Sequence, residues 1–218
     1  YTSDWCMAAG DGIGANGRNV EQRDYTNNSD YKDEWYVLMF EWNSDRTNAG
    51  YWETNPTLYR EKIDTSPYFY FNNGNNSAVD QWSNALDISF PSASKDEAKI
   101  KSYGATRSYF STYMGKTFDA STAGLTDFSW YTSNYKTLNY DGSTKNVYRM
   151  AGATIYILSE GYNNETQMNI VVHEFGHALG CFGHSPDSTD VMYAYCQPQY
   201  VLTQQDAGQL RFFYYTFK

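Results

Sequence analysis

The residues best suited to chemistry lie in one stretch of the 218-residue chain, HEFGHALGCFGH at positions 173–184, which holds all three of its histidines. His173 and His177 are four residues apart, so on a helix their imidazoles lie on one face and can reach the same ion. Imidazole nitrogen is a standard zinc ligand. Glu174, beside the first histidine, is placed to take a proton from a metal-bound water.

Gly180 and His184 complete the predicted site. Glycine adopts left-handed backbone conformations without a Cβ penalty, so Gly180 can end the helix and reverse the chain. The reversal brings His184 round as a third ligand. Three protein ligands leave one coordination position for water, as in catalytic zinc sites. The alternative is a core helix whose histidines are periodic by chance, and five residue types in fixed positions favour zinc over it.

These residues resemble the long zinc signature of the metzincin metalloproteases. Metzincins also have a methionine turn downstream, and SPDSTDVMYAY, which contains Met192, is similar to that turn. The resemblance implies that Met192 forms a hydrophobic base under the zinc site. Ser185 after the third histidine, with Tyr193 after the methionine, most resembles the matrixins or the related bacterial fragilysin. Ala194 differs from the tyrosine of astacins and serralysins and from the matrixin proline.

The resemblance implies an α+β fold, with a twisted mixed β-sheet, an active-site helix, a methionine turn and a C-terminal helix. The activity that it implies is hydrolysis of peptide bonds in a protein or peptide substrate, with one catalytic Zn²⁺ and with Glu174 as general base and acid. The alternatives are a latent or catalytically silent zinc-binding module and a zinc hydrolase of a non-peptide substrate. Structural calcium is common in matrixins, but no Asp-rich loop of EF-hand type supports it here.

Composition limits the class of protein. The net charge of −9 argues against nucleic acid or an anionic membrane as a partner. The chain has no run of eighteen apolar residues, so no membrane span is expected. A composition rich in Asn, Tyr, Ser and Thr and poor in Lys indicates a secreted, extracellular protein.

Two regions are expected along the chain. Residues 65–218 form the metzincin-like catalytic domain. Residues 1–64 form an N-terminal extension, either a remnant of a pro-segment or a layer packed on the domain. A latent form in which this extension blocks the cleft stays open. The carboxylates that could bind zinc in that form are Asp4, Asp11 and Asp24.

Apolar and aromatic runs predict the strands of the domain. These runs lie at residues 34–42, 67–73, 100–103 and 153–158. A helix is expected to start at Ser77, which has an acid three residues later, and its apolar stripe includes Trp82 as a core residue. The active-site helix is expected to begin at Asn163 or Asn164, whose side chains can cap it.

Residues 108–146 show no clear period, so the edge strand that would bind substrate is hard to locate. By the resemblance, substrate peptide would add to that edge as an antiparallel strand. Residues 128–131 and 148–152 are the two candidates. Tyr193 and Tyr195 are expected to line the S1′ pocket, which takes the residue after the scissile bond, and an apolar side chain is expected there.

The last helix is expected to begin at Thr203, with Asp206 three residues later as in a capping box. The stretch LTQQDAGQLRFFY resembles the matrixin C-terminal helix. The resemblance implies that Asp206 accepts hydrogen bonds from the methionine turn, and simple helix capping is the alternative.

Three cysteines leave the pairing open. One possibility is a Cys181–Cys196 disulfide, since both segments must converge beneath the metal. The other is two small buried thiols. Cys6 is left over.

Overall fold

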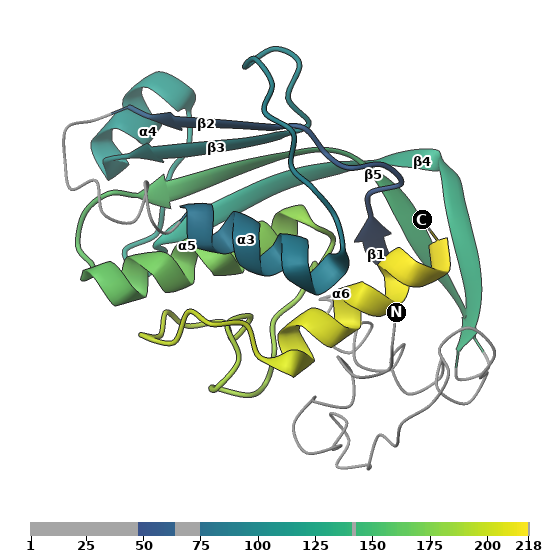
Figure 1. Ribbon diagram of the computed structural model, residues 1–218. Coiled ribbons are helices and arrows are strands. Elements are labelled where there is room, and N and C mark those ends of the chain that lie inside the picture. The colour runs from purple at the N-terminus through teal and green to yellow at the C-terminus, as the bar shows by residue number, and fades with distance from the viewer. Residues whose placement is uncertain (1–47, 64–74, 141–142, 218) are drawn as a thin grey trace.

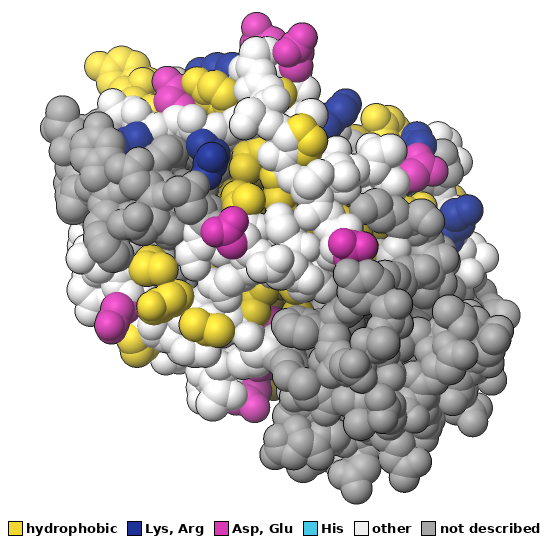
Figure 2. All heavy atoms as spheres, viewed as in Figure 1, with side chains coloured by type: hydrophobic (Ala, Val, Ile, Leu, Met, Phe, Trp, Pro, Cys, Tyr) yellow, Lys and Arg dark blue, Asp and Glu magenta, His cyan; other side chains and the backbone are white. Residues whose placement is uncertain are grey.

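The computed structural model describes residues 48–63, 75–140 and 143–217 (Figure 1). The strands predicted at 34–42 and 67–73 lie outside these residues. Within them, no helix is both long and apolar enough to cross a membrane. Figure 2 shows acidic and basic side chains interspersed over the described part of one face.

Five strands form one mixed, twisted sheet (Figure 1). They are β1 (Asn48–Tyr51), β2 (Leu58–Lys62), β3 (Ile100–Ala105), β4 (Gly124–Tyr140) and β5 (Ser143–Leu158). The long strand β5 is central: it pairs in parallel with β1 and β3 on one side and antiparallel with β4 on the other, while β3 pairs in parallel with β2. Among the described residues, β4 is therefore an edge strand.

Strands β1 and β2 come from the range that was expected to form the N-terminal extension. They are hydrogen bonded to β5 and β3, and Tyr51, Trp52 and Leu58 belong to the main hydrophobic core. The expected division at residue 64 therefore falls inside one sheet, and the fold that carries the site takes in residues from Asn48 onward.

Helices cover both faces of the sheet (Figure 1). Helices α3 (Asn75–Leu86), α5 (Asn164–Ala178) and α6 (Gln204–Phe217) pack on one face around the larger core, and α4 (Arg107–Met114) packs on the other around a smaller one. Successive residues of a strand point to opposite faces. In β5, Ile155 and Ile157 accordingly join the larger core, and Tyr156 and Leu158 join the smaller one. The α+β fold expected from the sequence is confirmed.

Helix α3 begins at Asn75, two residues before the expected start at Ser77. Trp82 is fully buried, and its indole N–H donates to the carbonyl oxygen of Val172 in α5 at 2.9 Å. The prediction that Trp82 is a core residue is confirmed. This bond ties α3 to the middle of the helix that carries the site.

The poorly periodic range 108–146 contains most of α4 and all of β4. The candidate edge segment 128–131 does lie in the edge strand β4. The other candidate, 148–152, is wrong because it lies in β5, which has neighbours on both sides. A large register shift between Trp130 and Tyr135 bends β4 and hides its alternation in the sequence.

Candidate active site

Helix α5 carries the first two histidines and Glu174. Asn163 caps its N-terminus, since the side-chain Oδ1 accepts the Thr166 N–H at 2.9 Å. Glu165 in the first turn interacts favourably with the helix dipole. The predicted cap is confirmed, and it sets the start of a helix whose inner face is buried from Gln167 to Ala178.

The C-terminal end of α5 is fixed by contacts with two other segments. The Trp52 indole N–H donates to the Ala178 carbonyl at 2.9 Å, and the Tyr214 hydroxyl donates to the Leu179 carbonyl at 2.8 Å. Such carbonyls lack partners within the helix. Gly180 follows with φ of 115°, and a Cβ there would lie 2.1 Å from the carbonyl oxygen of Gly50 in β1. Glycine is therefore required both by the backbone conformation and by the close approach of β1.

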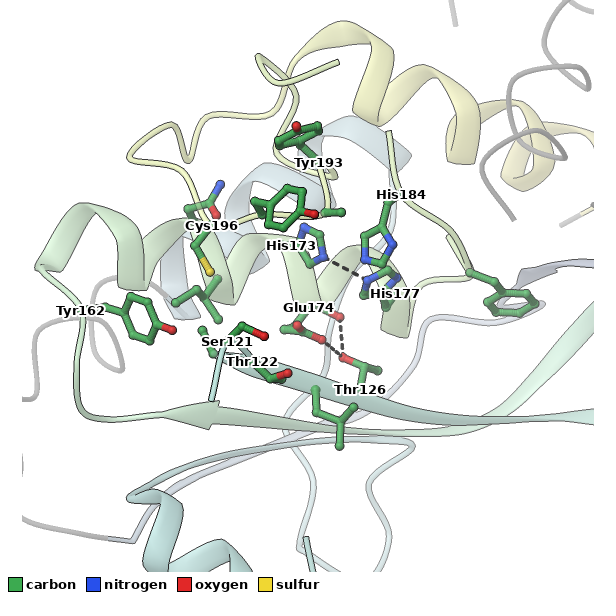
Figure 3. Close-up of a pocket in the computed structure, with 18 of the residues that line it drawn as sticks. Ser121, Thr122, Thr126, Tyr162, His173, Glu174, His177, His184, Tyr193 and Cys196 are labelled. Atoms are coloured by element: carbon green, nitrogen blue, oxygen red, sulfur yellow. Dashed lines mark hydrogen bonds between the residues drawn. The ribbon is translucent and has the colours of Figure 1, made fainter. Parts of the chain in front are cut away.

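The three histidines converge. One nitrogen from each of His173, His177 and His184 lies within 4.8 Å of the others, the one group of metal-binding character found in the part of the chain that is described. Figure 3 shows the three imidazoles gathered beside Glu174. The sequence prediction of which residues come together thus agrees with the geometry.

The third histidine comes one residue later than in the pattern H-E-x-x-H-x-x-G-x-x-H. Three residues separate Gly180 from His184 here, where the pattern has two. The longer loop is compact, because Cys181 donates its N–H to the Gly176 carbonyl at 3.1 Å and its thiol to the Gly183 carbonyl at 3.6 Å. This difference was not recognised in the sequence, and the loop accommodates it without removing His184 from the cluster.

Hydrogen bonds to main-chain carbonyls decide which imidazole nitrogens face the cluster. His173 Nδ1 donates to the Val191 carbonyl at 2.7 Å, and His177 Nδ1 donates to the Cys181 carbonyl at 2.6 Å. In the neutral imidazoles, both Nε2 atoms are then unprotonated. These two atoms lie 3.0 Å apart.

Two nitrogen lone pairs at this distance repel each other unless a cation lies between them. The nitrogens of two imidazoles bound to one tetrahedral zinc are about 3.3 Å apart, given Zn–N distances of roughly 2.0–2.1 Å. The arrangement of His173 and His177 therefore fits a shared metal ion closely.

Burial keeps the imidazoles neutral, which is the form that binds a metal. It lowers the pKa of His173 to about 4, although the Val191 carbonyl opposes this. Burial also lowers the pKa of His177 well below its usual value, and that of His184 as well. The cluster is thus ready for metal binding at neutral pH.

Glu174 extends into the same space from α5. Burial raises the pKa of its carboxyl to about 7, and a hydrogen bond from the Thr126 hydroxyl acts in the opposite direction. A pKa near the working pH suits a group that must both accept and return a proton.

Met192 packs against the helix that carries the first two histidines. A Cβ on Gly176 of α5 would lie 2.4 Å from the Met192 sulfur, so the sulfur packs against the helix backbone. The Ser185 N–H donates to the Met192 carbonyl at 2.8 Å, which links the loop of the third histidine to the methionine turn. Met192 itself is fully buried.

Asp206 acts both as a capping residue and as a partner of the methionine turn. Its Oδ2 accepts the Val191 N–H at 2.9 Å and its Oδ1 accepts the Met192 N–H at 2.9 Å. At the start of α6, the Asp206 N–H donates to Thr203 Oγ1 at 3.1 Å, as in a capping box. Asp206 therefore caps α6 and also accepts hydrogen bonds from the methionine turn, so the two interpretations from the sequence do not exclude each other.

A second buried acid, Asp190, supports the turn and was missed in the sequence. It accepts the hydroxyls of Ser185 and Thr203, each at 2.5 Å. Burial raises the pKa of Asp190, and burial together with the charge of Asp190 raises the pKa of Asp206 to about 7. The only signal in the sequence was an acid two residues before the methionine.

Arg107 is another supporting residue that sequence reasoning missed. Its guanidinium donates to the carbonyl oxygens of Phe118 at 2.8 Å, Asp119 at 2.7 Å and Thr122 at 3.3 Å. All three carbonyl oxygens therefore converge on one positively charged group, the Arg107 guanidinium. Arg107 therefore holds the segment that leads into β4 and lines the cleft.

A cavity of about 610 Å³ lies over the histidines and Glu174. One wall is the start of β4, and the other is α5 with residues 193–196. Tyr193 and Tyr195 both line it, with ring centroids 5.6 Å apart. On one side of Glu174, Figure 3 shows a group of polar side chains, which are Ser121, Thr122, Tyr162 and Cys196. These polar groups share the cavity with apolar side chains that include Ala123, Leu125 and Ile170.

Cys181 and Cys196 are both free thiols in the structure, the first buried and the second exposed. The alternative of a disulfide between them is not formed. Cys6 lies outside the described residues.

Comparison with known families gives one match. The sequence model of the matrixin family matches residues 70–215, a range that includes the three histidines, Glu174, Met192 and Asp206. A search of curated proteins finds no match.

Proposed function

Because the chain belongs to the matrixin family of metalloproteases, we propose that it is a zinc-dependent endopeptidase. His173, His177 and His184 are the zinc ligands, and Glu174 is the general base and acid. Gly180, Met192 and Asp206 support the site without touching the substrate. Residues from Asn48 onward form the catalytic domain, and the protein acts outside the cell, in keeping with its Asn-, Tyr- and Ser-rich composition.

The observation that carries this proposal is the convergence of three neutral imidazoles and one carboxyl of raised pKa in a single cavity. Bound zinc supplies a Lewis acid that makes water nucleophilic near neutral pH and polarises the scissile carbonyl. Glu174 accepts the proton of the attacking water and returns it to the leaving nitrogen. Burial raises the pKa of Glu174, which favours return of the proton to the leaving nitrogen.

The edge strand β4 supports a peptide as the substrate. Its outer edge can add a strand, and antiparallel addition would place residues before the scissile bond beside Phe128 and residues after it beside Gly124. Phe128 and Gly124 both line the cavity. Tyr193 and Tyr195 form the opposite wall of the S1′ pocket, and the polar side chains beyond Glu174 favour a side chain there that can form hydrogen bonds.

The test is cleavage of casein or gelatin by the zinc-loaded chain, with and without a chelator, beside Glu174→Ala. We expect chelator-sensitive cleavage that the substitution lowers by about 10²–10⁴-fold, the usual contribution of general acid–base catalysis. Glu165→Ala, in the exposed first turn of the same helix, is the matched control and should leave the rate unchanged.

The rival functions predict other results. A silent zinc-binding module would bind one zinc per chain and cleave nothing. A hydrolase of a non-peptide substrate would leave both proteins intact yet respond to Glu174→Ala on its own substrate. A chain that binds no zinc would overturn the proposal.

A further inference from the structure

Glu174 is held from the opposite wall of the cleft. The hydroxyl of Thr126, in the edge strand β4, lies 2.6 Å from Glu174 Oε2 and 3.1 Å from the Glu174 carbonyl oxygen. The shorter distance is typical of a charge-assisted O–H···O⁻ bond, which is about twice as strong as a neutral one. The contact joins two elements that are 48 residues apart in the sequence.

On the basis of the proposed peptidase function, we propose that Thr126 is a positioning residue that fixes the Glu174 carboxylate for proton transfer. A glutamate has three side-chain torsions, so its carboxylate can occupy several places above the helix. A hydrogen bond from the far wall selects one of them. Misplacing a reacting group by about 1 Å can cost 10²-fold in rate.

The backbone of β4 makes this contact possible. A Cβ on Gly124 would lie 2.7 Å from Glu174 Oε1 and 2.8 Å from Glu174 Cγ, so the strand passes the glutamate at the closest distance that a glycine allows. Residues 124 and 126 share one face of the strand. Thr126 is in register with Ile155 of the central strand, which anchors the hydroxyl on a rigid element.

The same strand would pair with the substrate main chain. Thr126 therefore places Glu174 relative to the edge that places the scissile bond. One short segment of β4 therefore positions both Glu174 and the scissile bond. For this reason the Thr126 hydroxyl should affect the rate of the reaction rather than the affinity for substrate.

The experiment compares Thr126→Val, which keeps the shape and removes the hydroxyl, with Thr126→Ser, which keeps the hydroxyl. For a peptide substrate we expect Thr126→Val to lower kcat about 10-fold with KM unchanged, and Thr126→Ser to restore kcat to within a factor of about two. Thr112→Val, the same substitution at an exposed position on α4, is the control and should match the unsubstituted chain. Zinc content should stay the same in all three.

Calorimetric binding of a peptide hydroxamate gives a second measurement that needs no turnover. Its hydroxyl proton needs a carboxylate acceptor beside the metal, so Thr126→Val should weaken binding about fivefold and Thr126→Ser should not. Unchanged kcat and hydroxamate affinity in Thr126→Val would overturn the inference, as would a loss of kcat that serine does not restore. If no form of the chain cleaves peptide, the proposed function fails, while the hydroxamate data still test Thr126.

Discussion

The two walls of the cleft differ in how they are held. The ligand wall comprises α5, the loop to His184, the methionine turn and the start of α6, and its supporting residues Met192, Asp190 and Asp206 are at most 2% exposed. The substrate wall comprises residues 121–130, and most of its side chains are partly or fully exposed. Buried polar bonds dominate the first wall, and Thr126 with Arg107 secures the second.

This difference predicts two kinds of mutational effect. Buried hydrogen-bonded groups are costly to leave without partners, so changes in the ligand wall should alter zinc binding and stability together. Changes in the exposed substrate wall should alter catalysis or substrate affinity and leave the free energy of unfolding nearly the same.

The largest effect should come from His184→Ala. His184 is the exposed member of the cluster, so its removal leaves the fold intact but opens the ligand set. We expect zinc affinity to fall by more than about 100-fold, beyond the usual loss from an outer-sphere partner, and peptide cleavage to disappear. Zinc per chain after dialysis is the measurement, with the exposed neighbour Ser188→Ala as control. Stoichiometric zinc in His184→Ala would show that the third ligand lies elsewhere.

Among substitutions that add a single methyl group to the ligand wall, Gly180→Ala should be the most destabilising. The new Cβ would lie 2.1 Å from the Gly50 carbonyl oxygen, and φ is 115°. We expect a loss of about 3 kcal/mol or more in the free energy of unfolding, measured in denaturant. Gly115→Ala is the matched control, with φ of 65° and no atom within 4 Å, and should cost only about 1–2 kcal/mol. Equal costs at both positions would mean that β1 moves aside readily.

Asp206 should make stability depend on pH. Its pKa is raised from 3.8 to about 7 by burial and by Asp190. The folded chain therefore keeps a proton that the unfolded chain loses above pH 4. This contribution is complete below about pH 4 and is lost as pH rises through about 7.

Asp206→Asn isolates that contribution. The amide cannot accept both main-chain N–H groups, so it should cost roughly 1–3 kcal/mol. The cost should be largest near pH 5 and shrink towards pH 8, because the contribution of the Asp206 proton is lost over that range and is absent from Asp206→Asn at every pH. Thermal or denaturant unfolding of both proteins from pH 5 to 8 measures it. A cost that grows with pH would mean that the carboxylate is ionised in the folded protein throughout.

The same contrast explains what could be predicted from the sequence. In the ligand wall the signals are local: the four-residue spacing of His173 and His177, the cap at Asn163 and the capping box from Thr203 to Asp206. Each depends on residues within one or two helical turns. The confirmed cap at Asn163 and the buried Trp82 both belong to helices with a regular period.

The substrate wall could not be predicted because its signals are not local. Strand β4 lies at an edge with exposed Ser, Thr and Tyr residues, so its hydrophobic pattern is weak, and the bend after Trp130 interrupts it. The three carbonyls bound by Arg107 and the reach of Thr126 to Glu174 appear only when distant segments fold together. The parallel pairing of β1 with β5 is non-local in the same way, and no local pattern in residues 48–51 predicts it.

The smallest effect should come from Phe128, at the end of the cleft that would hold residues before the scissile bond. Its ring stacks on Phe182 at 4.5 Å with an interplanar angle of 9°, and both rings line the cavity. Stacking is worth about 0.5–1.5 kcal/mol beyond area burial, so Phe128→Ala should raise KM about 2–10-fold for a peptide with an aromatic residue before the scissile bond.

A matched peptide with glycine there should be unaffected, as should the midpoint of thermal unfolding within a few degrees. Tyr113→Ala, an exposed ring on α4, is the control for both peptides. If Phe128→Ala instead lowers the melting temperature as Gly180→Ala does, this end of the substrate wall is part of the core. Phe128 would then behave like a residue of the ligand wall, whose substitution lowers stability.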